Sequence, residues 1–155
     1  MNFKFESLGD ISLIYGTSYL TDFTSDFTQE NTAIIEGKLL TVFGEPAEKS
    51  ENYENATNYV IRATSDDGAC VILSLYNQGV FHVGCASHDD LALAAAEALA
   101  EYVNAAAPAD YERTVYYLDA DMQIDISVKN GNVTINTSFV SEEKAEELFR
   151  KWYRF

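Results

Sequence analysis

Hydrophobic and polar residues alternate most regularly between Thr57 and Cys85. Three apolar runs, at 59–64, 70–76 and 80–85, are separated by two short polar segments that each contain a glycine near their end. Alternation with a period of two is typical of strands that bury one face. The segment therefore predicts a three-stranded antiparallel meander.

The loop lengths predict the register of this meander. A three-residue first loop, 66–68, places Ile61 opposite Leu73, whereas a two-residue loop would leave both faces mixed. A second loop at 77–79 places Val83 opposite Leu73, so both loops predict the same buried face. The opposite face is mixed in character, which predicts that another segment partly covers it. The residues expected on the buried face are Tyr59, Ile61, Ala63, Val71, Leu73, Leu75, Phe81, Val83 and Cys85.

The remaining pattern predicts further strands and three helices. Residues 16–27 are rich in Thr, Ser and Asp and are interpreted as a packed loop, while Asn130-Gly131 predicts a two-residue type I′ hairpin turn. Ser87 is expected to cap the second helix. Helices are predicted at Thr28–Phe43, from Asp89 to about Ala106 and from Ser141 to Trp152, and strands at 2–7, 112–118, 122–129 and 132–139. The prediction is a single α+β domain, 1–155, with an antiparallel sheet of about six or seven strands and three helices mainly on one face.

Composition agrees with a folded domain of this size. The chain has 155 residues, of which 47% are hydrophobic, which is enough to form a core. No apolar run approaches the roughly 20 residues of a membrane span, and the N-terminal residues do not resemble a signal peptide. Cys70 and Cys85 are predicted on opposite faces of the meander, so we expect reduced thiols and a cytoplasmic location.

Charge is the most unusual property of the sequence. Aspartate and glutamate number 25 against 10 lysines and arginines, which gives a net charge of −15. No lysine or arginine occurs between Ala63 and Glu112. Such a surface repels nucleic acid and anionic lipid and attracts a basic protein. Acidity that serves only solubility is the alternative explanation.

One group of polar residues could line a ligand pocket. Arg62, Ser74 and His82 are predicted on the same face of the meander, with His82 opposite Ser74. A serine beside a histidine is the arrangement required for nucleophilic catalysis. However, no carboxylate is placed to orient the imidazole, so we do not predict catalytic residues there.

Two sequence patterns resemble metal-binding sites only weakly. Cys85 and His88, followed by Asp89 and Asp90, have spacing that a metal could use, but zinc sites need three or four converging ligands. The segment that begins at Asp119 lacks the glycine and the terminal glutamate of a calcium loop. The sequence thus predicts no metal and no cofactor, and it disfavours an enzyme without excluding one.

Acidic residues beside tyrosines predict a surface that binds a basic partner. Tyrosine is enriched at protein interfaces, and carboxylates attract cationic groups. The alternative is that most of these tyrosines pack in or around the core. The expected partner-binding residues are Glu51, Tyr53, Glu54, Asp66, Asp67, Asp89 and Asp90.

The central third of the chain resembles small acidic bacterial immunity proteins of toxin systems. The resemblance is carried by VFGEP at Val42–Pro46, by NYEN at 52–55 and by SDDG at 65–68. It implies a protein that binds and neutralises a toxin domain, and it implies no catalytic residues.

Three hypotheses follow. The first is a binding protein that neutralises a basic toxin domain by electrostatic docking. The second is a small-molecule-binding or enzymatic domain whose pocket lies near Arg62, Ser74 and His82. The third is a homodimer or larger oligomer that buries the mixed face of the meander.

Overall fold

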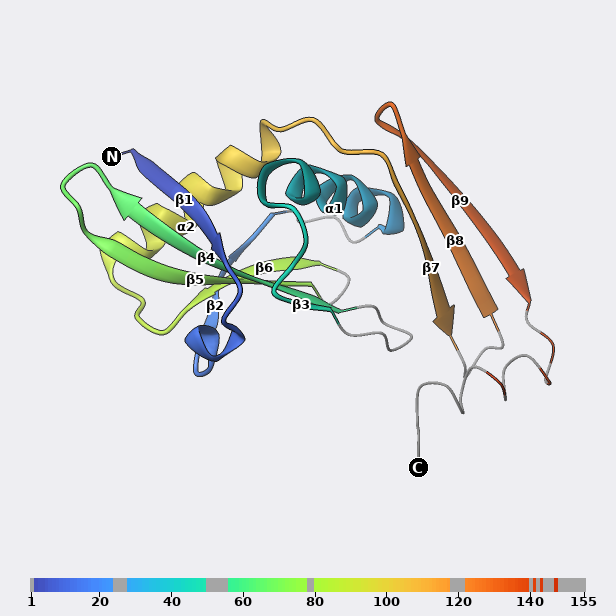
Figure 1. The fold of residues 1–155 in the computed structure, drawn as a ribbon, viewed down its shortest axis with the longest axis horizontal. Coiled ribbons are helices and arrows are strands. Elements are labelled where there is room, and N and C mark those ends of the chain that lie inside the picture. Colours follow the sequence, from blue (N-terminus) through green and yellow to red (C-terminus); the bar gives the residue numbers. More distant parts are fainter. Residues whose placement is uncertain are drawn as a thin grey trace.

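The computed structural model describes residues 2–23, 28–49, 56–77, 80–117 and 122–139, together with Ser141, Glu143 and Glu147 (Figure 1). Within these residues the chain is an α+β protein with antiparallel sheets and two α-helices. The elements in order are β1 (Phe3–Leu8), the 3-10 helix η1 (Ile11–Ile14), β2 (Ser18–Asp22), α1 (Gln29–Phe43), β3 (Glu48–Lys49), β4 (Thr57–Ser65), β5 (Cys70–Asn77), β6 (Phe81–Cys85), α2 (Asp90–Asn104), β7 (Tyr111–Tyr117), β8 (Met122–Lys129) and β9 (Asn132–Phe139).

The strands form two sheets rather than the single sheet expected from the sequence. Sheet A has the order β1-β4-β5-β6-β2, and the short β3 pairs with the first two residues of β4. Sheet B has the order β7-β8-β9. The division falls after α2, where residues 105–110 lead the chain away from sheet A (Figure 1).

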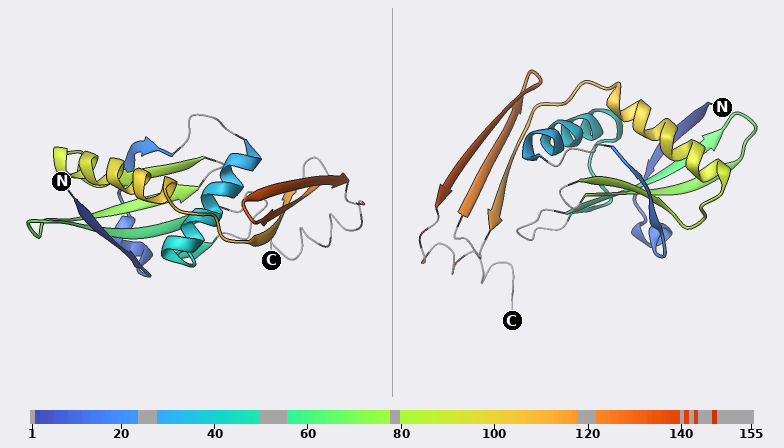
Figure 2. Two further views of the ribbon diagram at one scale, coloured as in Figure 1. Left: turned by 90° about the horizontal axis from the view of Figure 1, so that it is seen from above. Right: turned by 180° about the vertical axis from the view of Figure 1, so that it is seen from behind.

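The helices pack on one face of sheet A. Helix α2 lies across this face, and α1 lies between sheet A and sheet B, while η1 lies on the opposite face of sheet A (Figures 1 and 2). The third predicted helix, from Ser141 to Trp152, falls largely outside the described residues.

Helix α1 contributes to two hydrophobic cores. Ile35 and Leu39 pack with the buried face of the meander and with α2, whereas Ala33 packs against Ile124 and Ile126 of sheet B. Leu39 and Ala33 are both fully buried. This double packing is what joins sheet B to the rest of the molecule.

The first predicted register of the meander is confirmed and the second is wrong by two residues. Ile61 lies opposite Leu73, as expected, but Val83 lies opposite Leu75 and not opposite Leu73. The buried face is unchanged, because a shift of two preserves the alternation. The reason is Asn77, which was expected in the loop. It belongs to β5, and its buried side chain donates a hydrogen bond to Glu36.

The predicted hairpin of sheet B is confirmed. Val128 pairs with Val133 and Ile126 with Ile135. Asn130 and Gly131 both have positive φ, at 52° and 78°, which is the conformation that a type I′ turn requires.

The sequence predicted the start of α1 but not the residue that caps α2. Thr28, the first residue of the predicted helix, caps α1 by accepting a hydrogen bond from the Asn31 amide. The cap of α2 is Asp89, which accepts from the Ala92 amide, and not the predicted Ser87. Both residue types are good caps, so composition alone does not choose between them.

The segment interpreted as a packed loop contains an edge strand of sheet A. Strand β2 pairs with β6, and its register shifts between Tyr19 and Thr21. Such an irregularity breaks the period-two alternation by which a strand is recognised. This correction matters because β2 forms one wall of the site described below.

Candidate functional site

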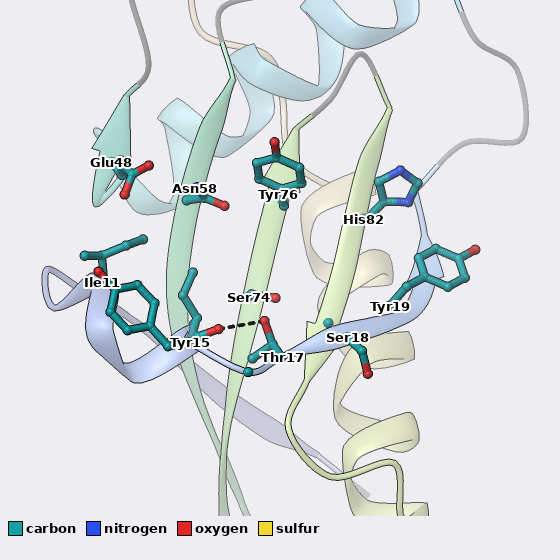
Figure 3. A pocket seen from close by; sticks show the side chains of 13 residues that line it. Ile11, Tyr15, Thr17, Ser18, Tyr19, Glu48, Asn58, Ser74, Tyr76 and His82 are labelled. Carbon is teal, nitrogen blue, oxygen red and sulfur yellow. Dashed lines mark hydrogen bonds between the residues drawn. The ribbon is translucent and has the colours of Figure 1, made fainter.

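A cavity among the described residues forms an open groove on the face of sheet A that α1 and α2 do not cover. It has a volume of about 720 Å³. One wall is the continuous segment from Ile11 to Tyr19, which comprises η1 and the start of β2, and the floor is formed by β4, β5 and β6 (Figure 3). The sequence predicted partial cover of this face, and η1 supplies it.

Local hydrogen bonds hold the η1 wall in place. The Asp10 carboxylate accepts from the Ser12 amide at 3.0 Å and so caps η1. Gly16 has a φ of 83°, which turns the chain, and the Thr17 hydroxyl donates to the Ile14 carbonyl at 2.8 Å. An aspartate cap followed by a glycine turn is the local signal for this compact bend.

Gly84 sets the shape of the floor. A Cβ atom at this position would lie 2.7 Å from the Ser74 Oγ atom and 2.9 Å from the Ser18 carbonyl oxygen. Only a residue without a side chain allows β2 and Ser74 to approach this closely.

Aromatic side chains dominate the walls. Tyr15 is 73% exposed and Tyr19 is 56% exposed, and both line the groove together with Tyr76 (Figure 3). The Tyr19 ring meets the His82 imidazole edge to face at a centroid distance of 5.1 Å. The buried Nδ1 atom of His82 has no hydrogen-bond partner within the described residues.

Two of the three predicted pocket residues line the groove. Ser74 and His82 are part of the lining, but His82 lies opposite Tyr76, and Ser74 lies opposite Gly84. Arg62 is not part of the lining, and its guanidinium binds the Glu6 carboxylate of β1 at 3.2 Å.

The serine–histidine contact at this site involves different residues. The Ser18 hydroxyl lies 2.8 Å from Nε2 of His88, and both side chains are exposed. Sequence reasoning missed this contact because Ser18 was placed in a loop. It joins the groove wall to the residue that precedes the Asp89 cap.

The predicted acidic residues fall into two groups. Strands β4 and β6 run in the same direction through sheet A, so Asp66 and Asp67, which follow β4, lie at the same end as Asp89 and Asp90, which follow β6 (Figure 1). All four are exposed. The other group, Glu51, Tyr53 and Glu54, lies outside the described residues.

Several of these carboxylates have local roles. Asp66 accepts from the Asn2 amide at 3.2 Å, and Asp67 accepts from the Ser65 hydroxyl and the Ala69 amide. The Ser65 hydroxyl lowers the pKa of Asp67, and the Ala69 amide adds to this effect. Asp89 caps α2. These bonds leave negative charge at the surface but show that the carboxylates also shape their own turns.

Acidic residues lie in the groove lining and next to a residue that contacts it. Glu48 lines it and precedes the 51–54 segment by a few residues. Ser18 lines it too and binds His88, which precedes Asp89 and Asp90. Sequence analysis identified Asp89 and Asp90 and part of the groove floor, but it did not identify the aromatic wall at Tyr15 and Tyr19.

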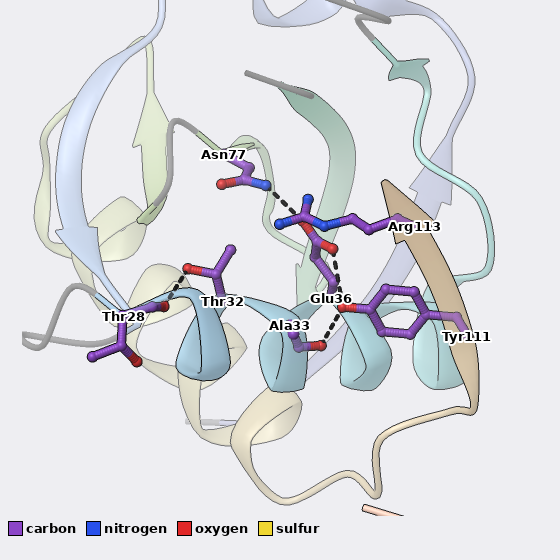
Figure 4. A network of polar contacts seen from close by, with 7 residues as sticks. All are labelled: Thr28, Thr32, Ala33, Glu36, Asn77, Tyr111 and Arg113. Carbon is purple, nitrogen blue, oxygen red and sulfur yellow. Dashed lines mark hydrogen bonds and ion pairs between the residues drawn. The ribbon is translucent and has the colours of Figure 1, made fainter. Parts of the chain in front are cut away.

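A second, smaller cavity of about 170 Å³ lies where α1 meets β7. Its main feature is the buried carboxylate of Glu36, which binds the Arg113 guanidinium at 2.5 Å and accepts from Asn77 at 2.9 Å (Figure 4). The Tyr111 hydroxyl lies 3.0 Å from this carboxylate and 2.6 Å from the Ala33 carbonyl oxygen.

Burial is the largest influence on this cluster. Desolvation raises the pKa of Glu36, and the Arg113 charge and the hydrogen bonds from Tyr111 and Asn77 oppose that rise. Burial also raises the pKa of Tyr111. With three partners around one carboxylate, we interpret the cluster as a polar connection between α1, β5 and β7.

In the part of the chain that the structure describes, no group of three or more histidine, cysteine, aspartate or glutamate side chains could hold a metal ion. Cys85 and His88 therefore do not form the metal site considered above. Cys70 is exposed, Cys85 is buried, and both are free thiols. None of the described helices has the length and apolar character needed to cross a membrane.

The fold and site define an α+β protein with an aromatic groove on the open face of its larger sheet. Comparisons with protein-family models, with curated proteins and with solved structures found no match.

Proposed function

We propose that this protein is a non-enzymatic binding module that neutralises a cationic protein, as immunity proteins of toxin systems do. The observation that carries the proposal is the aromatic groove on the open face of sheet A, which has Glu48 in its lining and contacts His88, the residue before Asp89 and Asp90. A cytoplasmic location forms part of the proposal, and the two free thiols agree with it.

The tyrosines supply anchoring groups for a protein partner. Tyr15 and Tyr19 expose large rings at the groove wall. Aromatic residues that become buried in a complex contribute much of its binding energy, and tyrosine adds a hydroxyl for hydrogen bonding. A lysine or arginine of the partner can also stack on these rings.

The net charge defines the kind of partner. With 15 more negative than positive charges, the protein attracts cationic surfaces and repels phosphate backbones. Among the described residues that line the groove, Glu48 alone carries a carboxylate, and it can pair directly with a basic side chain.

Binding is favoured over catalysis by the arrangement of the titratable residues. His82 lies opposite Tyr76 rather than Ser74, and the exposed Ser18–His88 pair lies beside an Asp89 whose carboxylate caps α2. Nucleophilic catalysis requires a nucleophile, a base and an orienting group that are hydrogen-bonded in sequence, and these residues do not form that arrangement.

A small ligand is the second candidate occupant of the groove. A volume of about 720 Å³ lies within the range typical of ligand pockets, and the His82 side chain is part of the lining. Thermal-shift screening with uncharged and cationic aromatic compounds tests this alternative. A compound that stabilises the wild type but not His82→Ala would support it.

The protein partner can be tested by association kinetics with the purified product of the neighbouring gene. Electrostatic docking predicts that the association rate constant falls by at least about tenfold between ~50 and ~500 mM NaCl, since salt screens the attraction. Co-expression should also protect cells from that product. A rate constant that does not depend on salt would count against the proposal.

A further inference from the structure

Strand β9 differs from the other edge strands in its composition. It is the outer strand of sheet B, and the sequence from Asn132 to Phe139 contains no charged residue, proline or glycine (Figure 1). Every other edge strand among the described residues carries charge. These charged residues are Lys4 and Glu6 of β1, Asp22 of β2, Glu48 and Lys49 of β3, and Glu112 and Arg113 of β7.

Charges on edge strands normally prevent sheets from joining edge to edge. In a chain with a net charge of −15, an eight-residue edge without charge is therefore notable. The pairing of β9 with β8 also continues from Asn132 to Phe139 without a bulge, so no irregularity protects this edge.

The backbone of β9 has an outward set of hydrogen-bonding groups. The two-residue turn makes Lys129 and Asn132 the hydrogen-bonded pair that closes the hairpin. Because the pattern alternates, Thr134 and Asn136 also bond inward to β8. The amides and carbonyls of the odd-numbered residues, such as Ile135 and Thr137, point away from the sheet.

The side chains of the odd-numbered residues extend the apolar face of sheet B. Ile124, Ile126 and Val128 of β8 are buried on this face, but Ile135 is 38% exposed and Phe139 is 86% exposed. Among the described elements, helix α1 packs against both β8 and β9, yet these two side chains of β9 keep their exposure.

We propose that β9 pairs antiparallel with β9 of a second copy of this chain, so that two three-stranded sheets join into one. A two-fold axis places odd-numbered residues opposite odd-numbered residues, which brings outward amides and carbonyls together. Ile135 and Phe139 then contact uncharged side chains of the other copy.

A second copy fits this edge better than a cationic protein does. The edge carries no carboxylate to attract a basic partner, whereas like-charged copies can approach each other only where charge is absent. This interface is separate from the groove, which lies on sheet A. It also differs from the dimer expected from the sequence, which buried the mixed face of the meander.

Sedimentation equilibrium of the full chain tests the proposal. Between about 1 µM and about 1 mM protein, the average mass should rise from that of the monomer towards twice that value. The Ile135→Lys variant should raise the dimer dissociation constant at least about tenfold, because the axis brings two like charges together. Leu93→Lys is the matched control, since Leu93 on α2 is 41% exposed and should not change dimerisation.

Thr137→Pro provides a second variant that spares the hairpin. It removes an outward amide, so the pairing of β9 with β8 keeps its hydrogen bonds. Amide hydrogen exchange gives the location: Ile135 and Thr137 should be protected in concentrated protein and exchange rapidly in dilute protein.

A chain that remains monomeric over this concentration range would overturn the proposal. So would a dimer that Ile135→Lys and Thr137→Pro leave intact. Protection of the β9 amides only after a cationic protein is added would assign the edge to that partner instead.

Discussion

Gly84 is the residue on which the shape of the groove depends most directly. A Cβ atom there would meet both the Ser74 Oγ atom and the Ser18 carbonyl oxygen at less than 3 Å. We predict that Gly84→Ala destabilises the protein by about 1–3 kcal/mol, as overpacking commonly does. Urea unfolding measures this change.

Gly9→Ala is the matched control for this substitution. A Cβ atom at Gly9 would have no neighbour within 4 Å, so the control should change the unfolding free energy by no more than about 0.5 kcal/mol. Equal effects of the two substitutions would contradict the close approach at Gly84.

Ser65 has a measurable effect on Asp67. The Ser65 hydroxyl donates to the Asp67 carboxylate and is the largest cause of its lowered pKa. Because the pKa of Asp67 is lower in the folded state, its ionised carboxylate stabilises the fold at pH values above the ordinary aspartate pKa. This contribution to stability is lost as the pH falls through the folded-state pKa. Ser65→Ala should therefore raise the pKa of Asp67 towards its ordinary value.

An NMR titration of the Asp67 carboxylate in the wild type and in the variant measures the change. If the pKa of Asp67 stays low in the Ser65→Ala variant, the hydrogen bond is not its cause.

The connection between α1 and sheet B contains a buried carboxylate whose titration should affect stability. Burial raises the folded-state pKa of Glu36 above its ordinary value, so the folded state holds this proton more tightly than the unfolded state. The contribution of Glu36 to stability therefore falls as the pH rises from the ordinary glutamate pKa through the raised folded-state pKa.

Glu36→Gln removes this titration and tests it. On acidification from pH 7 to pH 5, we expect the wild type to gain unfolding free energy relative to the variant. Urea unfolding of both proteins at the two pH values gives the difference, in which the titration of all other groups cancels. A difference that does not change with pH, or that changes in the opposite direction, would contradict the raised pKa.

The elements that sequence predicted well are those governed by local turns. The β8–β9 register followed from Asn130-Gly131, and the β4–β5 register followed from the loop that ends at Gly68. The β5–β6 register required a tertiary contact, the hydrogen bond from Asn77 to Glu36, which no local pattern reveals. Strand β2 escaped prediction because its irregular register hides the alternation.

Part of the candidate site was predictable because the local turns also determine which face of a strand each residue lies on. Ser74 and His82 lie on strands whose faces could be assigned, so they were placed on the correct face of sheet A. Tyr15 follows η1 and Tyr19 lies on β2, and their position over the sheet depends on the turn at Gly16 and on pairing with a distant strand. Local periodicity does not contain that information.

For the whole molecule, the distribution of charge explains how the two proposed interfaces can coexist. The groove of sheet A lies near Glu48, Asp89 and Asp90, whereas the β9 edge of sheet B is uncharged. Long-range attraction of a cationic protein should therefore act on sheet A, and self-association should act at sheet B. A dimer formed through β9 leaves one groove open in each copy.

The most direct test of the proposed function is the affinity for the cationic partner when the aromatic wall is removed. Isothermal titration calorimetry should show that the double variant Tyr15→Ala, Tyr19→Ala binds at least about 30-fold more weakly than the wild type, a loss of about 2 kcal/mol. The control Leu93→Ala, which removes an exposed apolar side chain from α2, should change the affinity by less than about twofold. Equal affinities for the double variant and the wild type would show that the groove is not the binding surface.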